Sequence, residues 1–226
     1  MGFQIRIWPS WISIHYFRRG GLALKQPLLI ATSNSGKLRE VQEILGASQF
    51  ELFTLADFAN VRAVAETGAT FAENAFLKAS GYARQTCTLT LADDSGLQID
   101  ALGGAPGVKS ARFISETAAY EERNRAILGQ LNAKENRAAR FVCVIAIAAR
   151  DGRLLRTSTG ICEGHIAQSV RGTGGFGYDP IFVPDGYELT FGELPSEIKN
   201  RISHRARALE SARQFLQSLT ISSAAG

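Results

Sequence analysis

The sequence predicts an α/β protein in which helices flank a mixed β-sheet. Short apolar runs and segments with helical periodicity alternate along the chain from Leu28 onward. Of the 226 residues, 45% are hydrophobic and 20% are charged, which excludes a disordered tail and a low-complexity chain. Because no internal repeat or linker interrupts residues 28–226, we expect one domain there.

Residues 1–27 differ in composition from the rest of the chain. They contain four basic residues and no acidic residue, whereas basic and acidic residues balance in the remainder, although the whole chain carries a net charge of +4. Arg6, Pro9 and His15 interrupt the apolar stretch, which argues against a secretory signal. We expect a poorly ordered N-terminal extension, with a transit peptide or a membrane-surface segment as the alternative. No window is long enough for a membrane span.

The three cysteines, Cys87, Cys143 and Cys162, form no C-x-x-C pair. An odd number without that spacing supports neither a disulfide framework nor a zinc ribbon. The sequence therefore predicts a cytoplasmic protein with reduced thiols.

The first half of the domain reads as strands alternating with helices. We expect strands at 28–31, 50–55 and 88–92, and an amphipathic helix over about 36–47. Thr70 and Glu73 have capping-box spacing, which predicts a helix that begins there and ends near Cys87.

The second half continues the same alternation. We expect a helix over 117–131, a buried strand over 140–149 and a returning strand over 153–167, because Asp151-Gly152 is a hairpin turn signal. A glycine-rich loop over 172–177 precedes a short apolar run at 181–183. Ser203 is the expected N-cap of a last helix that ends near Leu219.

The segment Ser33 to Lys37 follows a predicted strand and opens a predicted helix. Free backbone amides and the positive end of the helix dipole favour an anion there, and Lys37 adds a full charge. Ala31 and Leu38 stand where a Walker A motif needs Gly and Ser or Thr, so this is not a P-loop. The alternative is a capped helix with a surface lysine.

Asp93 and Asp94 follow the predicted strand 88–92, and Gly96 is expected to let the backbone turn. Neighbouring side chains of a strand point to opposite faces, so one carboxylate can face a site while the other supports the loop. Carboxylate oxygens at a strand end suit Mg²⁺ held jointly by protein and phosphate. The alternative is an Asp-rich turn without a ligand.

Two further segments complete the pattern. Phe176 in the glycine-rich loop and Tyr178 just after it offer rings on which a planar base can stack. Lys199, His204 and Arg205 put positive charge near the start of the last helix, which opposes the helix dipole unless an anion is present. Together these features favour a site for a nucleoside triphosphate.

Five ordered blocks of the sequence resemble the inosine triphosphate pyrophosphatase family, which converts non-canonical purine nucleoside triphosphates to monophosphate and pyrophosphate. The blocks are ATSNSGK (31–37), ETGATFAENAFLKA (66–79), ADDSGLQIDALGGAPGVKSAR (92–112), GTGGFGYDPIF (172–182) and ISHRARAL (202–209). The resemblance implies an elongated mixed sheet, two lobes around a central cleft, a homodimer and Mg²⁺ as cofactor. It implies neither a nucleic-acid nor a membrane partner.

Carried over by position, the resemblance also implies the site residues. Asp94 would be the proton acceptor and a metal ligand, and Glu66 a second, weaker candidate ligand because Ala65 replaces a glutamate common in bacterial relatives. The implied substrate-binding residues are Thr32, Ser33, Asn34, Ser35, Gly36, Lys37, Ser95, Phe176, Gly177, Tyr178, Asp179, Lys199, His204 and Arg205.

The expected reaction is hydrolysis of ITP, dITP and XTP at the α-phosphorus. Asp94 would orient or deprotonate the attacking water, while Lys37, Lys199 and Arg205 would stabilise the leaving pyrophosphate. Donors from Arg205, His204 or loop amides would select the purine 6-carbonyl. A different class of function stays open: a nucleotide-sensing or single-stranded nucleic-acid-binding module that uses the same loops without hydrolysis.

Overall fold

The computed structural model describes residues 25–46 and 49–224, and side chains up to residue 219. We expected residues 1–27 to be poorly ordered. Residues 1–24 lie outside the described part of the chain, and only residues 25–27 lie within it. Of these three, Gln26 and Pro27 belong to the domain, because the first strand begins at Gln26.

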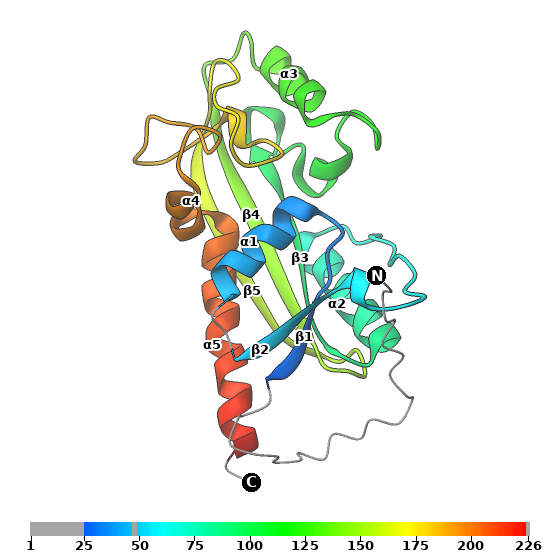
Figure 1. The fold of residues 1–226 in the computed structure, drawn as a ribbon. Helices are drawn as coiled ribbons and strands as arrows, with labels where there is room; N and C mark the ends of the chain where they lie inside the picture. Colours follow the sequence, from blue (N-terminus) through cyan, green and yellow to red (C-terminus); the bar gives the residue numbers. More distant parts are fainter. Residues whose placement is uncertain (1–24, 47–48, 225–226) are drawn as a thin grey trace, which may run out of the picture.

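The described chain forms one six-stranded sheet flanked by helices, as the sequence predicts (Figure 1). The strands are β1 (Gln26–Ile30), β2 (Phe50–Thr54), β3 (Leu89–Ile99), β4 (Ala138–Ala148), β5 (Leu154–Ile166) and β6 (Phe182–Pro184). The helices are α1 (Ser35–Leu45), α2 (Phe71–Thr86), α3 (Tyr120–Gln130), α4 (Ser196–Ile202) and α5 (His204–Ala224).

The sheet is mixed, with strand order β2-β1-β3-β4-β5-β6. β1 pairs in parallel with both β2 and β3, because α1 and α2 carry the chain back across the sheet after β1 and β2. The pairs β3–β4, β4–β5 and β5–β6 are antiparallel. The turn Ala149–Arg153 joins β4 and β5 where the Asp151-Gly152 signal predicts it.

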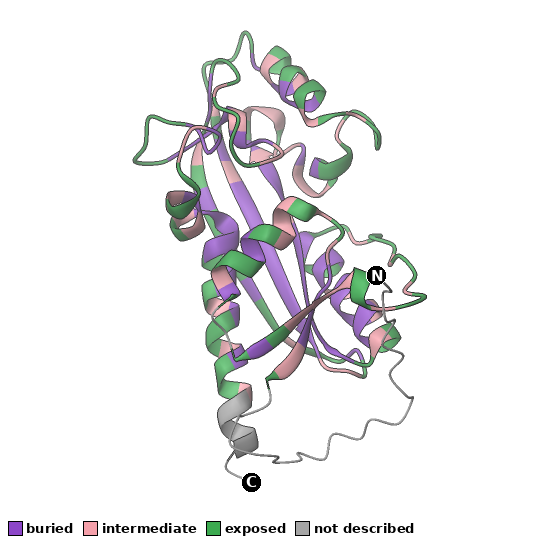
Figure 2. Cartoon of the chain, viewed as in Figure 1, coloured by how far each residue is buried: buried purple, intermediate pink, exposed green. Residues whose placement is uncertain are grey.

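Helices cover both faces of the sheet, and Figure 2 shows the long strands as its most continuously buried part. α1 and α5 pack on one face around Leu28, Val41 and Leu209, and α2 packs on the other around Leu29 and Ala79. The alternation of Leu28 and Leu29 between these two clusters follows from the two-residue period of a strand.

A third cluster joins the far ends of β3, β4 and β5 to α3 and to the segment around β6. In Figure 1 this smaller lobe lies at the top, and β1, β2 and α2 form the lobe below it. The two lobes of the expectation are therefore present, and the long strands run through both.

One predicted boundary is wrong in a way that matters for the site. The strand expected at 88–92 continues to Ile99, so Asp93 and Asp94 lie inside β3 and not in a turn after it. β4 pairs with β3 from Thr90 to Ile99 and so keeps the backbone extended. Gly96 serves close packing, since a Cβ there would lie 2.4 Å from the Gly107 carbonyl oxygen.

Candidate active site

A cleft of about 650 Å³ lies between the two lobes. Its volume is in the range of small-molecule sites. It is lined by the loop after β1, the start of α1, the middle of β3, the segment 108–112 and the start of α5. Segments that are far apart in the sequence thus meet in one hollow.

The start of α1 forms one wall of the cleft. Asn34 is the N-cap: its Oδ1 accepts a hydrogen bond from the Lys37 amide at 3.0 Å, and its own amide donates to the Thr32 hydroxyl at 3.2 Å. In the described part of the chain, no hydrogen bond uses the amides of Ser35 and Gly36. These two amides and the helix dipole leave a place for an anion.

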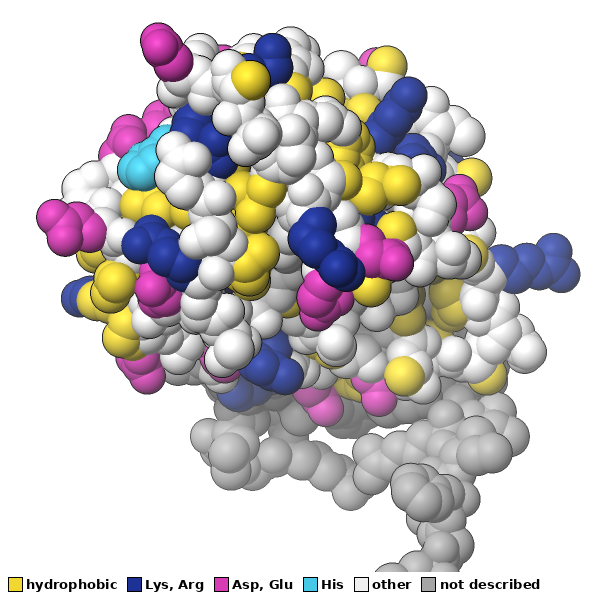
Figure 3. All heavy atoms as spheres, turned by 90° about the horizontal axis from the view of Figure 1, so that it is seen from above, with side chains coloured by type: hydrophobic (Ala, Val, Ile, Leu, Met, Phe, Trp, Pro, Cys, Tyr) yellow, Lys and Arg dark blue, Asp and Glu magenta, His cyan; other side chains and the backbone are white. Residues whose placement is uncertain are grey.

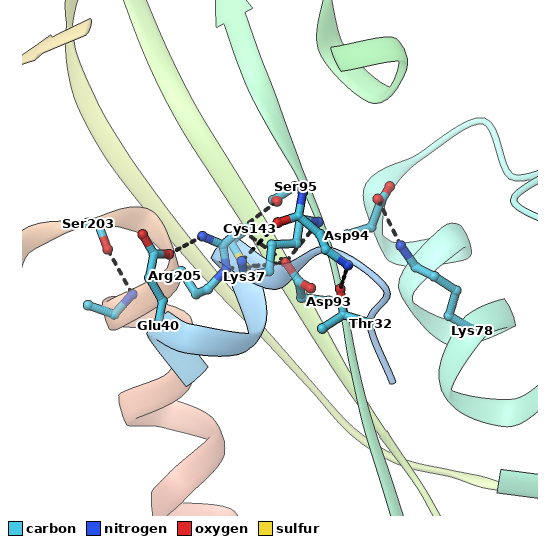
Figure 4. A network of polar contacts seen from close by, with 12 residues as sticks. Thr32, Lys37, Glu40, Lys78, Asp93, Asp94, Ser95, Cys143, Ser203 and Arg205 are labelled. Carbon is cyan, nitrogen blue, oxygen red and sulfur yellow. Dashed lines mark hydrogen bonds and ion pairs between the residues drawn. The ribbon is translucent and has the colours of Figure 1, made fainter. Parts of the chain in front are cut away.

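Asp93 and Asp94 point to opposite faces of β3, as their positions in one strand predict. In Figure 4, Lys78 lies on one side of this strand, and Arg205 and Glu40 lie on the other. Asp94 lines the cleft, whereas Asp93 faces α1 and α5. Both carboxylates are buried, with 3% and 6% exposure for Asp93 and Asp94.

Asp93 belongs to a buried network of ion pairs. It lies 3.1 Å from the Lys37 amine and 3.2 Å from the Arg205 guanidinium. Arg205 also pairs with Glu40, which in turn lies 2.6 Å from Lys199. The positive charge at the start of α5 therefore meets the protein's own carboxylates, which accounts for its position against the helix dipole.

The network lowers the pKa of Asp93 and of Glu40. Burial raises the pKa of Asp93, but Lys37, Arg205 and Lys78 lower it more, so the net pKa is well below the ordinary carboxyl value. Burial likewise raises the pKa of Glu40, and Arg205 with Lys199 outweighs that effect. Both groups are held as carboxylates.

Asp94 has a different environment. Its Oδ1 accepts a hydrogen bond from the Lys78 amine at 3.2 Å, and the same amine lies 3.1 Å from the Glu66 carboxylate. Burial raises the pKa of Asp94, and Lys78 and Lys37 only partly oppose it. Asp94 therefore holds a proton more readily than an exposed aspartate.

The residues around Asp94 fit a divalent cation bound together with phosphate. The Oδ2 of Asp94 is buried and has no hydrogen-bond partner in the described residues. Glu66, bridged to Asp94 by Lys78, is half-exposed. The described residues of the chain include no cluster of three or more His, Cys, Asp or Glu side chains that could hold a metal ion. Mg²⁺, however, is usually held by one or two carboxylates plus substrate oxygens. Two carboxylates with one free buried oxygen meet that requirement.

The glycine-rich loop is held by Asp179. Its Oδ2 accepts a hydrogen bond from the Phe176 amide at 2.7 Å and pairs with Lys199. The Phe176 ring lies 4.8 Å from the Lys199 amine, and a Cβ on Gly36 would lie 2.6 Å from that ring. Gly36 is thus required so that α1 can approach the ring.

His204 is buried at the cleft with its ring stacked on Phe141, 4.6 Å between centroids. Burial and the nearby charges of Arg205 and Lys199 lower its pKa well below the ordinary value, so the imidazole is neutral. Its Nδ1 has no hydrogen-bond partner among the described residues. A neutral ring with an unpaired nitrogen can form a hydrogen bond with a polar edge of a ligand.

The structure brings all the candidate residues of the sequence to this region. Fourteen of them, including Glu66, Asp94 and Ser95, line the main cleft. Ser35 and Gly36 line an adjoining hollow behind Phe176. Arg205 differs from the expectation: its donors are engaged by Asp93, Glu40 and the Ser95 hydroxyl, so it organises the site more than it offers free hydrogen bonds.

Sequence reasoning missed several residues of the site, among them four with polar side chains that bear on its chemistry. Glu40 lies on α1 beyond the block that ends at Lys37, Lys78 lies on α2, and Arg112 and Tyr120 line the cleft from the smaller lobe. Lys78 and Arg112 fall within the quoted blocks 66–79 and 92–112, so the motifs contained the signal. Only the contacts distinguish them from other polar residues nearby.

Fold and site together define an α/β protein whose two lobes enclose a cleft suited to an anionic ligand and a divalent cation. The chain belongs to the Ham1 family, whose model matches residues 28–215. It is 46% identical over 196 residues to a dITP/XTP pyrophosphatase of Desulforamulus reducens, covering 86% of this chain and 97% of that protein. A dITP/XTP pyrophosphatase of Nostoc sp. is 47% identical over 197 residues, covering 87% and 97%.

Solved structures agree with the fold. A HAM1 protein of Coxiella burnetii superimposes with a TM-score of 0.78 at 41% identity, covering 85% of this chain and 99% of that one. The Ham1 protein of Staphylococcus aureus gives a TM-score of 0.77 at 35% identity, with the same coverage. No helix of the described residues has the length and apolar character needed to cross a membrane.

Proposed function

We propose that this protein hydrolyses the non-canonical purine nucleoside triphosphates ITP, dITP and XTP to the monophosphate and pyrophosphate, with Mg²⁺ as cofactor. The proposal rests on one observation. Asp94 is a buried carboxylate with one unpaired oxygen, and it lies in a cleft with basic walls. The names of the similar proteins from Desulforamulus reducens and Nostoc sp. support the same substrates.

Glu66 and Asp94 would hold the metal. When bound, Mg²⁺ would neutralise charge on the phosphates and help to orient them. The Lys78 amine holds both carboxylates toward the cleft through contacts of 3.1 and 3.2 Å. The free amides at the start of α1 and the Lys37 amine meet the phosphate chain from the opposite wall.

Asp94 is the general base for the attacking water. Its carboxylate lines the cleft where the water would attack, and a positioned carboxylate can take up a proton in the transition state. The Asp94 carboxylate accepts a proton from the water that attacks the α-phosphorus in line, and pyrophosphate leaves. The reaction needs no covalent bond between enzyme and substrate.

The base of the nucleotide would lie against the Phe176 ring, near Lys199 and His204. Because the donors of Arg205 are engaged and the Lys199 amine pairs with Glu40 and Asp179, the His204 ring and loop amides are the donors left for a purine 6-carbonyl. Adenine has an amino group at that position and would leave these buried donors unpaired, which is strongly unfavourable.

The product pair tests the proposal. The full-length protein is incubated with dITP, XTP, GTP or ATP, with Mg²⁺ or with a chelator, and products are separated by ion-exchange chromatography. We expect monophosphate and pyrophosphate from dITP and XTP, slower turnover of GTP and ATP, and loss of turnover with the chelator. Diphosphate and orthophosphate would contradict it, and binding without hydrolysis would support the nucleotide-binding module instead.

A nucleic-acid-binding surface has weaker support. In Figure 3, basic and acidic side chains are interspersed on the end of the molecule that carries the smaller lobe, without a continuous basic face. A cytoplasmic homodimer, expected from the sequence, belongs to the same proposal. Light scattering after gel filtration tests the dimer.

A further inference from the structure

The cationic side chains that line the cleft differ in whether they pair with a carboxylate. Four of them pair with carboxylates: Lys37 with Asp93, Lys78 with Asp94 and Glu66, Lys199 with Glu40 and Asp179, and Arg205 with Glu40 and Asp93. The fifth, Arg112, has no carboxylate partner among the described residues. In these pairs five carboxylates face four cations, so the paired cations leave no positive excess for a triphosphate.

Arg112 stands on a rigid base. It ends the 3₁₀ segment Gly107–Arg112, which Ser110 holds against β3 and against the glycine-rich loop. The Ser110 hydroxyl accepts from the Leu97 amide at 2.9 Å, and the Ser110 carbonyl accepts from the Tyr178 hydroxyl at 2.7 Å. The backbone that carries Arg112 is therefore attached to β3 and to Tyr178, the residue after the glycine-rich loop.

The Arg112 side chain is exposed at the cleft and reaches toward the other lobe. Its one hydrogen bond in the described structure is from a terminal nitrogen to the Glu66 carbonyl oxygen, at 3.4 Å. A contact of that length is weak, so the guanidinium can exchange it for a phosphate oxygen. A guanidinium offers two parallel donors to a phosphate, which makes such an exchange favourable.

The contacts around the cleft give Arg112 a position along the substrate. The Phe176 ring lies near Lys199 and Arg205, and Arg205 donates to the hydroxyl of Ser95, the residue after Asp94. Lys78 joins Asp94 to Glu66, and the Glu66 carbonyl oxygen accepts the hydrogen bond from Arg112, so Arg112 is separated from Phe176 by this series of contacts. A nucleotide whose base lies against Phe176 and whose α-phosphate lies at Asp94 would direct its terminal phosphates toward Arg112.

We propose that Arg112 is a substrate-binding residue that holds the β- and γ-phosphates and so makes the cleft select triphosphates. The inference rests on the proposed function. It also reassigns a role, because Lys37, Lys199 and Arg205 were the expected partners of the leaving pyrophosphate and their charges are compensated within the protein. Arg112 supplies an uncompensated charge at the place where that group departs.

The test compares Arg112→Gln and Arg112→Lys with the wild-type protein. Each full-length protein is assayed with Mg²⁺ for pyrophosphate release from dITP, and for inhibition by tripolyphosphate and by dIMP. For Arg112→Gln we expect the KM for dITP and the inhibition constant of tripolyphosphate to rise about tenfold to hundredfold, the usual effect of losing a charged hydrogen bond. The inhibition constant of dIMP should stay unchanged, and Arg112→Lys should show a smaller rise.

Lys109→Gln is the matched control. Lys109 is an exposed cation of the same 3₁₀ segment that does not line the cleft, so its removal should change neither KM nor inhibition. Thermal unfolding reports whether each variant folds; if Arg112→Gln does not, Arg112→Lys carries the test through its own rise in KM and in the tripolyphosphate constant.

Unchanged tripolyphosphate inhibition in a folded variant would overturn the proposal, as would an equal loss of dIMP and tripolyphosphate binding. A wild-type protein that releases no pyrophosphate from dITP would instead reject the proposed function itself.

Discussion

Asp93 and Asp94 are neighbours in the sequence, yet the protein uses them in opposite ways. Asp93 lies among Lys37 and Arg205, and its pKa is lowered; Asp94 lies in the cleft beside Lys78, and its pKa is raised. Because a strand sends consecutive side chains to opposite faces, one dipeptide provides a carboxylate held in ion pairs and the carboxylate that we propose as the general base. The two faces of β3 should therefore respond differently to the same substitution.

The largest effect is expected from Asp94→Asn. Loss of the general base and of a metal ligand should lower kcat for dITP at least about a thousandfold, which corresponds to about 4 kcal/mol of activation free energy. The free energy of unfolding should change little, because burial already disfavours the charged form of Asp94. Pyrophosphate release and urea denaturation measure the two quantities.

Near-normal turnover by folded Asp94→Asn would remove Asp94 from the catalytic role. A large loss of stability would show that Asp94, like Asp93, is mainly structural. Retained binding of dITP, followed by calorimetry, separates a catalytic loss from a failure to bind.

The next effect is expected from Asp93→Asn on the other face. The substitution leaves Lys37 and Arg205 without their shared carboxylate, and breaking a buried pair costs about 3 kcal/mol or more. Urea denaturation should show this loss at neutral pH. Asp100→Asn is the control, because Asp100 pairs with Arg140 at the surface, where such pairs contribute about 0–1 kcal/mol. Equal effects of the two substitutions would contradict the comparison.

A smaller effect is expected from Glu40→Gln, since Asp179 and Asp93 still pair with Lys199 and Arg205. We expect a loss of about 2 kcal/mol at neutral pH. The folded pKa of Glu40 is lowered, so its contribution is present above the ordinary glutamate pKa and is lost as pH falls through the lowered value.

The contribution of Glu40 to stability should decrease as pH falls. Below about pH 5 the unfolding free energy of the wild-type protein should fall more steeply than that of Glu40→Gln. Urea denaturation at a series of pH values measures both slopes. Parallel curves would mean that Glu40 does not contribute through its charge.

Much of the fold could be predicted because it depends on local patterns. The Thr70–Glu73 capping box, the Asp151-Gly152 hairpin and the Ser203 cap all occur where the sequence places them. The extension of β3 through the two aspartates could not be predicted, because only pairing with β4 keeps so polar a segment extended. Propensity alone indicates a turn there.

The candidate site divides in the same way. The sequence motifs predicted that Asp94, Lys37 and the glycine-rich loop belong to the site, because these motifs contain the residue types that bind phosphate and metal ions. They did not reveal that Arg205 is engaged by carboxylates, or that Arg112 is not. Pairing depends on residues more than a hundred positions apart, and no local pattern records such distances.

The sequence by itself determined the alternation of strands and helices, the family and the chemical groups available to the site. Tertiary structure alone decided which of these groups meet. Charges act over a few ångströms, so the same lysine or arginine is a phosphate ligand or a structural ion depending on what folding brings beside it.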